Sequence, residues 1–116
     1  MDLAKKLQLR PGQGVDASGV AATGLAALAD VATEDGPDAA LLVFVTDRAA
    51  LGDHLGSVVA AASADRLTWV AYPKSGQLGT DLNRDSLAAL LTAEGVRPVR
   101  QVSIDDVWSA LRFRPA

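Results

Sequence analysis

The sequence contains no cysteine and a single histidine, His54. Without cysteine, the chain has no disulfide framework, no thiolate metal site and no thiol nucleophile. A zinc site at His54 would need several aspartate or glutamate ligands beside it, and the sequence shows no such cluster. We therefore expect no bound metal, and we interpret His54 as a partly exposed residue in the middle of a helix.

Long apolar runs and aromatic residues are also scarce. No run approaches the roughly 20 residues that cross a bilayer. Residues 1–6 have no apolar stretch after their lysines, so we expect no secretory signal. These absences indicate a cytoplasmic protein without membrane contact. Aromatic residues make up 4% of a chain that is 49% hydrophobic, so the core has to be mostly aliphatic.

Positive charge is in deficit, because the net charge is −3 and the pI is about 4.9. This balance argues against general nucleic-acid binding, which needs clustered Lys and Arg to neutralise phosphates. Residues 96–116 are an exception, since they carry Arg97, Arg100, Arg112 and Arg114 against two aspartates. These arginines form either the solvated face of a strand pair or a local patch for an acidic partner or anion.

A length of 116 residues fits one domain, residues 1–116. The apolar runs Ala39–Val45 and Leu67–Tyr72 do not alternate, which is typical of strands buried on both faces. Between them, apolar residues recur at helical spacing from Leu51 to Ala62, with Asp47 as the expected N-cap. The expected elements in chain order are a short helix at 3–10, a weak helix at 15–31 with a brief strand at 14–17, a strand at 39–45, a helix after Asp47, a strand at 67–72, a helix from Thr80 or Asp81 to Gly95, and strands at 96–104 and 107–113.

This order of elements predicts the fold class. Strand, helix, strand, helix and a closing strand pair are typical of an α/β fold. We expect a three-layer, Rossmann-like parallel sheet with helices on its faces and a C-terminal antiparallel hairpin. The hairpin is expected because only Asp105 and Asp106 separate its two strands.

The carboxyl ends of parallel strands are where such sheets bind ligands. Here two loops reach that rim, 46–48 and 73–76. If a helix begins at Thr80 or Asp81, its free N–H groups lie near Lys74 and two glycines, which predicts an anion site. In the alternative interpretation, Thr80 or Asp81 caps those N–H groups and Lys74 is solvated. The candidate ligand-binding residues are Asp47, Arg48, Tyr72, Lys74, Thr80 and Asp81.

The aromatic residues suggest a second surface. Exposed tryptophan is enriched at interfaces, so Trp108 with Arg112 and Arg114 is a candidate partner-binding site. The alternative is that Trp108 covers the sheet edge. From strand periodicity, Trp108 and Phe113 should face opposite sides of the sheet, and so should Trp69 and Tyr72.

Two motifs are similar to those of a known family. WVAYPK at residues 69–74 and IDDVWSALRFRP at residues 104–115 resemble the closing motifs of a bacterial domain-of-unknown-function family of small proteins. Its members look like truncated relatives of the Rossmann-like methyltransferase fold, and the link 79–85 fits the same pattern. The resemblance covers residues 39–116, whereas residues 1–38 look like a degenerate first part. It implies a fold and a bacterial origin, and no specific activity.

Cofactor chemistry finds little support in the residues. Methyltransferases and dinucleotide enzymes need a glycine-rich turn after the first strand, and the glycines of residues 12–19 have the wrong interval. No Walker-type loop is present and no serine lies in a nucleophile elbow. We therefore expect no cofactor and no catalytic residue. The leading hypothesis is a non-catalytic binding or interaction module. The alternatives are a small-molecule or nucleotide-binding enzyme of methyltransferase-like ancestry, and a homodimer formed through the edge hairpin.

Overall fold

The computed structural model describes residues 3–19, 31–33, 36 and 38–116. Most of the weak helix expected at 15–31 lies outside these residues. The brief strand expected at 14–17 is confirmed, because Val15–Gly19 form a strand, and the helix therefore does not begin at Val15. The elements are α1 (Leu3–Lys6), β1 (Val15–Gly19), β2 (Ala40–Phe44), α2 (Arg48–Ser63), β3 (Thr68–Pro73), α3 (Arg84–Thr92), β4 (Val96–Ser103) and β5 (Trp108–Pro115).

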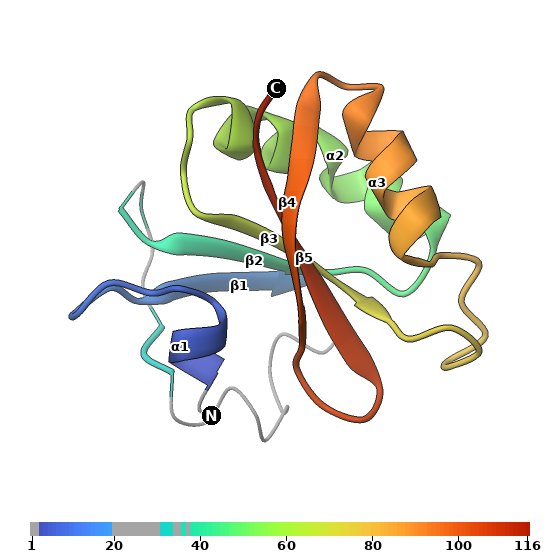
Figure 1. Cartoon of the computed structure of the whole chain (residues 1–116), viewed down its shortest axis with the longest axis horizontal. Coiled ribbons are helices and arrows are strands. Elements are labelled where there is room, and N and C mark those ends of the chain that lie inside the picture. Colours follow the sequence, from blue (N-terminus) through green and yellow to red (C-terminus); the bar gives the residue numbers. More distant parts are fainter. Residues whose placement is uncertain (1–2, 20–30, 34–35, 37) are drawn as a thin grey trace.

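The strands form one mixed sheet in the order β1-β2-β3-β5-β4 (Figure 1). β1, β2 and β3 are parallel, β5 is antiparallel to β3, and β4 is antiparallel to β5. The predicted α/β class is therefore confirmed. The parallel pairing that was expected holds for three strands, and the last two strands run antiparallel, with β4 at the edge.

One face of the sheet is covered by α2 and α3, which lie on the same side in Figure 1. Leu51 and Val58 of α2 and Leu87 and Leu91 of α3 are buried against it. As predicted, Asp47 caps α2, because its carboxylate accepts a hydrogen bond of 2.8 Å from the N–H of Ala50. Such a cap is typically worth about 1 kcal/mol.

The other face is covered by α1 among the described elements. The indole N–H of Trp69 donates to the carbonyl of Leu7 at 3.0 Å, which fixes the end of α1 to β3. Trp108 packs edge-on against Phe44 on this face, with ring centroids 5.1 Å apart. The predicted facing of the aromatic residues is confirmed, since Tyr72 and Phe113 belong to the core on the α2–α3 side.

The link between β4 and β5 is longer than expected and spans residues 104–107. The carboxylate of Asp105 accepts hydrogen bonds from the N–H groups of Val107 and Trp108, both at 2.8 Å. Asp105 therefore shapes a turn, as the sequence predicted.

Among the described residues, no helix is long and apolar enough to cross a membrane.

Gly19 at the end of β1 is the position where the backbone of β1 most needs glycine. Its φ is +90°, and an added Cβ would overlap the carbonyl oxygen of Phe44 on β2. Gly12 also has positive φ, +78°, but an added Cβ there would meet no heavy atom within 4 Å. The two glycines thus share the backbone conformation and differ in the space around them.

Replacing Gly19 by alanine should lower the free energy of unfolding by about 3 kcal/mol, from left-handed strain plus overpacking against β2. The matched control Gly12→Ala should cost only about 1 kcal/mol, because it adds the strain alone. Urea unfolding followed by circular dichroism measures both. Equal losses in the two variants would show that the close contact between β1 and β2 does not limit Gly19.

Candidate functional site

The carboxyl-end rim holds a shallow hollow of about 390 Å³ beside Tyr72 and Lys74. Tyr72 is buried at the end of β3, and its phenol oxygen accepts a hydrogen bond of 2.9 Å from the amide of Gln101. The ammonium of Lys74 donates to the hydroxyl of Ser103 at 2.8 Å. The hollow is lined by Tyr72, Lys74, Ser75, Asn83, Arg84, Asp85, Gln101 and Ser109.

The remaining rim candidates lie elsewhere. Asp81 accepts a hydrogen bond of 2.9 Å from the backbone N–H of Arg48, which is the first residue of α2. Asp47 and Asp81 therefore both place carboxylates at the N-terminus of α2, where the helix dipole favours negative charge. Through this bond Asp81 ties the long β3–α3 loop to α2. Asp47, Arg48 and Asp81 do not line the hollow of Tyr72 and Lys74.

The predicted helix start at Thr80 or Asp81 is wrong. α3 begins at Arg84, with Asn83 as its N-cap and Ser86 completing a capping box. The hydroxyl of Thr80 instead accepts from the N–H of Leu82, a turn that precedes the helix. The reciprocal bonds of Asn83 and Ser86 satisfy two donors at once, so they outcompete the earlier single caps. The anion site that was expected between Lys74 and a helix at Thr80 is therefore not formed as predicted.

Burial raises the pKa of Tyr72 above its ordinary value, and the hydrogen bond from Gln101 partly offsets the rise. Tyr72 is the single tyrosine of the chain. Its ionisation is therefore readable alone by absorbance. Because the folded-state pKa is raised, the folded protein holds this proton more tightly than the unfolded chain. The resulting stabilisation is present below pH about 10 and is lost as the pH rises through the folded-state value.

A spectrophotometric titration should give a phenolate midpoint above the ordinary value of about 10. In Gln101→Ala the midpoint should rise further, since the variant lacks the donor that stabilises the phenolate. Gln13→Ala, which removes an amide far from Tyr72, serves as the control and should leave the midpoint unchanged. A midpoint at or below that of a model peptide would mean that the ring is exposed to water.

Four arginines occupy one face at the open end of the β4–β5 pair. The register places Arg97 opposite Arg114 and Arg100 opposite Arg112. Trp108 and Ala110 face the α1 side, so strand alternation puts Arg112 and Arg114 on that same side, with their cross-strand neighbours. We call these residues the arginine ladder: Arg97, Arg100, Arg112 and Arg114.

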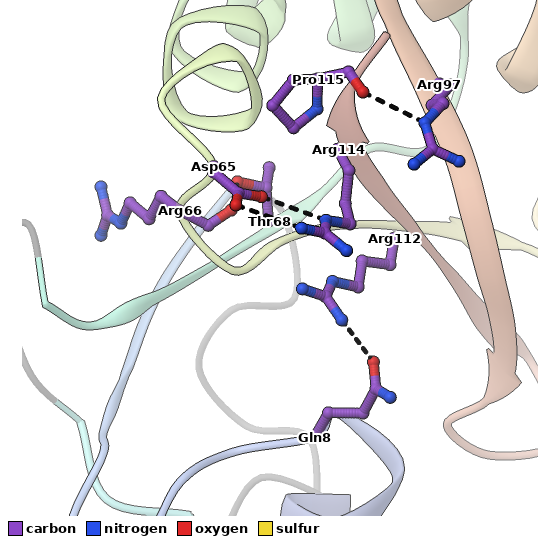
Figure 2. A network of polar contacts seen from close by, with 8 residues as sticks. All are labelled: Gln8, Asp65, Arg66, Thr68, Arg97, Arg112, Arg114 and Pro115. Carbon is purple, nitrogen blue, oxygen red and sulfur yellow. Dashed lines mark hydrogen bonds and ion pairs between the residues drawn. The ribbon is translucent and has the colours of Figure 1, made fainter.

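The ladder has few internal counter-charges. Figure 2 shows Arg114 turned toward Asp65, with which it forms two contacts of 3.1 Å, and Arg112 turned toward Gln8, whose oxygen accepts at 2.7 Å. Arg97 donates to the carbonyl of Pro115. Among the described residues, Asp65 is the one acid within ion-pair distance of the ladder.

The pKa values of the ladder residues reflect this excess of positive charge. The hydrogen bond between Asp65 and Arg114 lowers the pKa of the carboxyl group and raises that of the guanidinium. Burial lowers the pKa of Arg112, the neighbouring charges of Arg114 and Arg100 lower it further, and the charge of Asp65 partly offsets the fall. Arg112 is therefore a partly buried cation between two like-charged neighbours, without an ion pair of its own to any described residue.

Trp108 is 4% exposed. The interpretation of an exposed indole for a partner is therefore wrong, and the alternative, in which Trp108 packs on the sheet, fits its contact with Phe44. The physical reason is strand alternation, which turns Trp108 toward the α1 face of the core. The predicted partner residues Arg112 and Arg114 remain partly exposed beside Arg97 and Arg100.

A second hollow, of about 740 Å³, lies at the amino ends of β2 and β3, opposite the predicted rim. Its walls include Gln8, Arg10, Gln13, Asp65, Arg66 and Arg112. Except for Arg112, sequence reasoning missed these residues. The residues that line the hollow come from four separate segments, so no local motif could have indicated them.

No group of three or more His, Asp or Glu side chains that could hold a metal occurs in the described part of the chain. Comparison with protein-family models, curated proteins and solved structures found no match in any of the three. The family resemblance of residues 39–116 therefore stays a prediction.

Proposed function

We propose that this chain is a non-catalytic α/β binding module of the cytoplasm, built as a three-layer Rossmann-like domain. Its arginine ladder binds an acidic segment of a partner protein. The observation that carries the proposal is the register of β4 on β5, which places Arg97 against Arg114 and Arg100 against Arg112.

Like charges directly opposite each other on neighbouring strands destabilise a sheet, by roughly 0.2–1 kcal/mol per pair. Asp65 compensates one of the four guanidinium groups. A string of carboxylates along the ladder would neutralise the rest, because planar guanidinium groups bind carboxylates through two parallel hydrogen bonds. Relief of the repulsion between the arginines would therefore contribute to the free energy of binding an acidic partner.

The chemistry of the whole chain favours an acidic protein over nucleic acid. The net charge is −3, so acidic groups elsewhere on the surface oppose a long polyanion. A short acidic segment contacts only the arginine ladder and stays clear of those acidic groups.

A homodimer through the exposed edge of β4 is disfavoured, because antiparallel pairing would bring Arg97 and Arg100 of two copies together. Pro98 also interrupts that edge.

The alternative function, a small-molecule or nucleotide-binding enzyme of methyltransferase-like ancestry, would use the rim hollow of Tyr72 and Lys74. We favour the binding module because Lys74 is hydrogen-bonded to Ser103 and Tyr72 to Gln101. Neither side chain is thereby poised as an acid or base for a substrate.

The test is fluorescence anisotropy with a labelled oligoglutamate peptide at low ionic strength. Wild type should bind it, and the affinity should fall as salt is added. The double variant Arg97→Gln/Arg100→Gln should lose affinity by about tenfold or more, since two charge-assisted contacts disappear. Both side chains are exposed, so the fold should tolerate the change.

The matched control is Arg48→Gln/Arg84→Gln, which removes the same charge from exposed positions off the ladder. It should bind the peptide nearly as wild type does. Equal losses in both double variants would reduce the effect to net charge and contradict the proposal. Tighter binding of a single-stranded RNA of matched charge would also contradict it, in favour of a nucleic-acid partner.

A further inference from the structure

The hollow at the amino ends of β2 and β3 is built by segments that lie far apart in the sequence. The α1–β1 connection supplies Gln8, Arg10 and Gln13, the α2–β3 turn supplies Arg66, and β5 supplies Arg112. Its volume of about 740 Å³ lies within the roughly 300–1,000 Å³ of pockets that hold small molecules.

Two arginines in the wall of the hollow have internal acceptors for only some of their hydrogen-bond donors. Arg66 donates from Nε to the carbonyl of Ala39 at 2.7 Å and lies 3.5 Å from Asp16. Arg112 donates one Nη to Gln8. Within the described part of the chain, Nε of Arg112 is buried without a hydrogen-bond partner, whereas Nη2 of Arg66, which makes no hydrogen bond either, is the atom that faces Asp16 in the ion pair. Each guanidinium offers five donors, so both arginines retain capacity for further acceptors.

Buried donors without acceptors are costly and rare in folded proteins. Nε of Arg112 is such a donor, and its place in the wall of the hollow points to a missing acceptor. Water is a weak match for several guanidinium groups, whereas an oxyanion provides both charge and multiple acceptor oxygens. The feature is therefore typical of a site for an anion.

The charge around the hollow agrees with this interpretation. Arg10, Arg66 and Arg112 face two acids in the wall, Asp38 and Asp65. Asp65 is already engaged by Arg114. Arg66 is paired with Asp16, so Arg10 and Arg112 are left with Asp38 as the remaining acid of the wall, and the cations exceed the free acids by one.

The wall is also held in place without a ligand. The amide of Gln13 accepts from the backbone N–H of Arg10 at 3.0 Å and donates to the carbonyl of Asp38 at 2.9 Å. The bond from Trp69 to Leu7 anchors the segment before it. A site that is ordered in advance loses less entropy when a ligand binds.

We propose that this hollow binds a small organic oxyanion, a phosphate or carboxylate compound, through Arg10, Arg66 and Arg112. It is a second site and does not rest on the acidic partner, although Arg112 belongs to both. The two sites are separable because Arg10 lines only the hollow, and Arg97 and Arg100 belong only to the ladder.

The test is a two-dimensional ¹H–¹⁵N NMR titration with inorganic phosphate and, separately, succinate, at constant ionic strength. Saturating shifts should occur in the side-chain Nε–H signal of Arg112 and the backbone N–H of Gln13, and not in that of Lys74. Arg10→Gln should weaken binding by about tenfold, the loss of one charge-assisted contact. The anion that binds more tightly identifies phosphate or carboxylate as the preferred group.

Arg97→Gln is the matched control, because it removes a nearby arginine that does not line the hollow. It should bind phosphate as wild type does. If it weakens binding as much as Arg10→Gln, the anion sits on the ladder and the hollow is not the site. Shifts that never saturate for either anion would also overturn the inference. Since Arg10→Gln should leave oligoglutamate affinity unchanged, failure of the hollow and failure of the ladder are distinguishable.

Discussion

The position of β5 between β3 and β4 is the constraint on which the surface of this protein depends. β5 pairs antiparallel with both neighbours, so each residue from Ser109 to Phe113 has a fixed neighbour on either side. Trp108 and Ala110 are buried on the α1 face, and Leu111 and Phe113 on the other. A slip of one residue would move these apolar side chains to the wrong faces. The core therefore dictates where the arginines go.

The result is a conflict between packing and electrostatics. Burial of the apolar residues of β5 outweighs the repulsion between paired arginines, because a fully buried side chain contributes about 1.5–3 kcal/mol and a like-charge pair costs less than about 1. Asp65 relieves one end of the ladder, and Arg112 is left between Arg114 and Arg100 without an ion pair to the described residues. Local conflicts that a fold retains are where function is expected. Here both proposed sites, the ladder and the hollow, meet at Arg112.

The sequence predicted the buried strands and the cap of α2 because these depend on neighbours in the chain. Continuous apolar runs marked β2 and β3, and Asp47 preceded helical spacing. The start of α3 was misplaced because Thr80, Asp81 and Asn83 are all good caps. The capping box of Asn83 with Ser86 decides among them, together with the tertiary contact that engages Asp81 with Arg48. The arginines were noticed as a charged segment, but their pairing depends on a register that no local pattern specifies. The hollow was missed because its walls come from four separate segments.

A double-mutant cycle on the folding stability of Arg100 and Arg112 tests the central claim, that the ladder is electrostatically strained, most directly. Arg100→Gln should raise the free energy of unfolding by roughly 0.2–1 kcal/mol at low salt. The gain should vanish in an Arg112→Gln background and shrink at high salt. If Arg100→Gln instead lowers stability, or acts equally with and without Arg112, the paired arginines do not repel and the account fails.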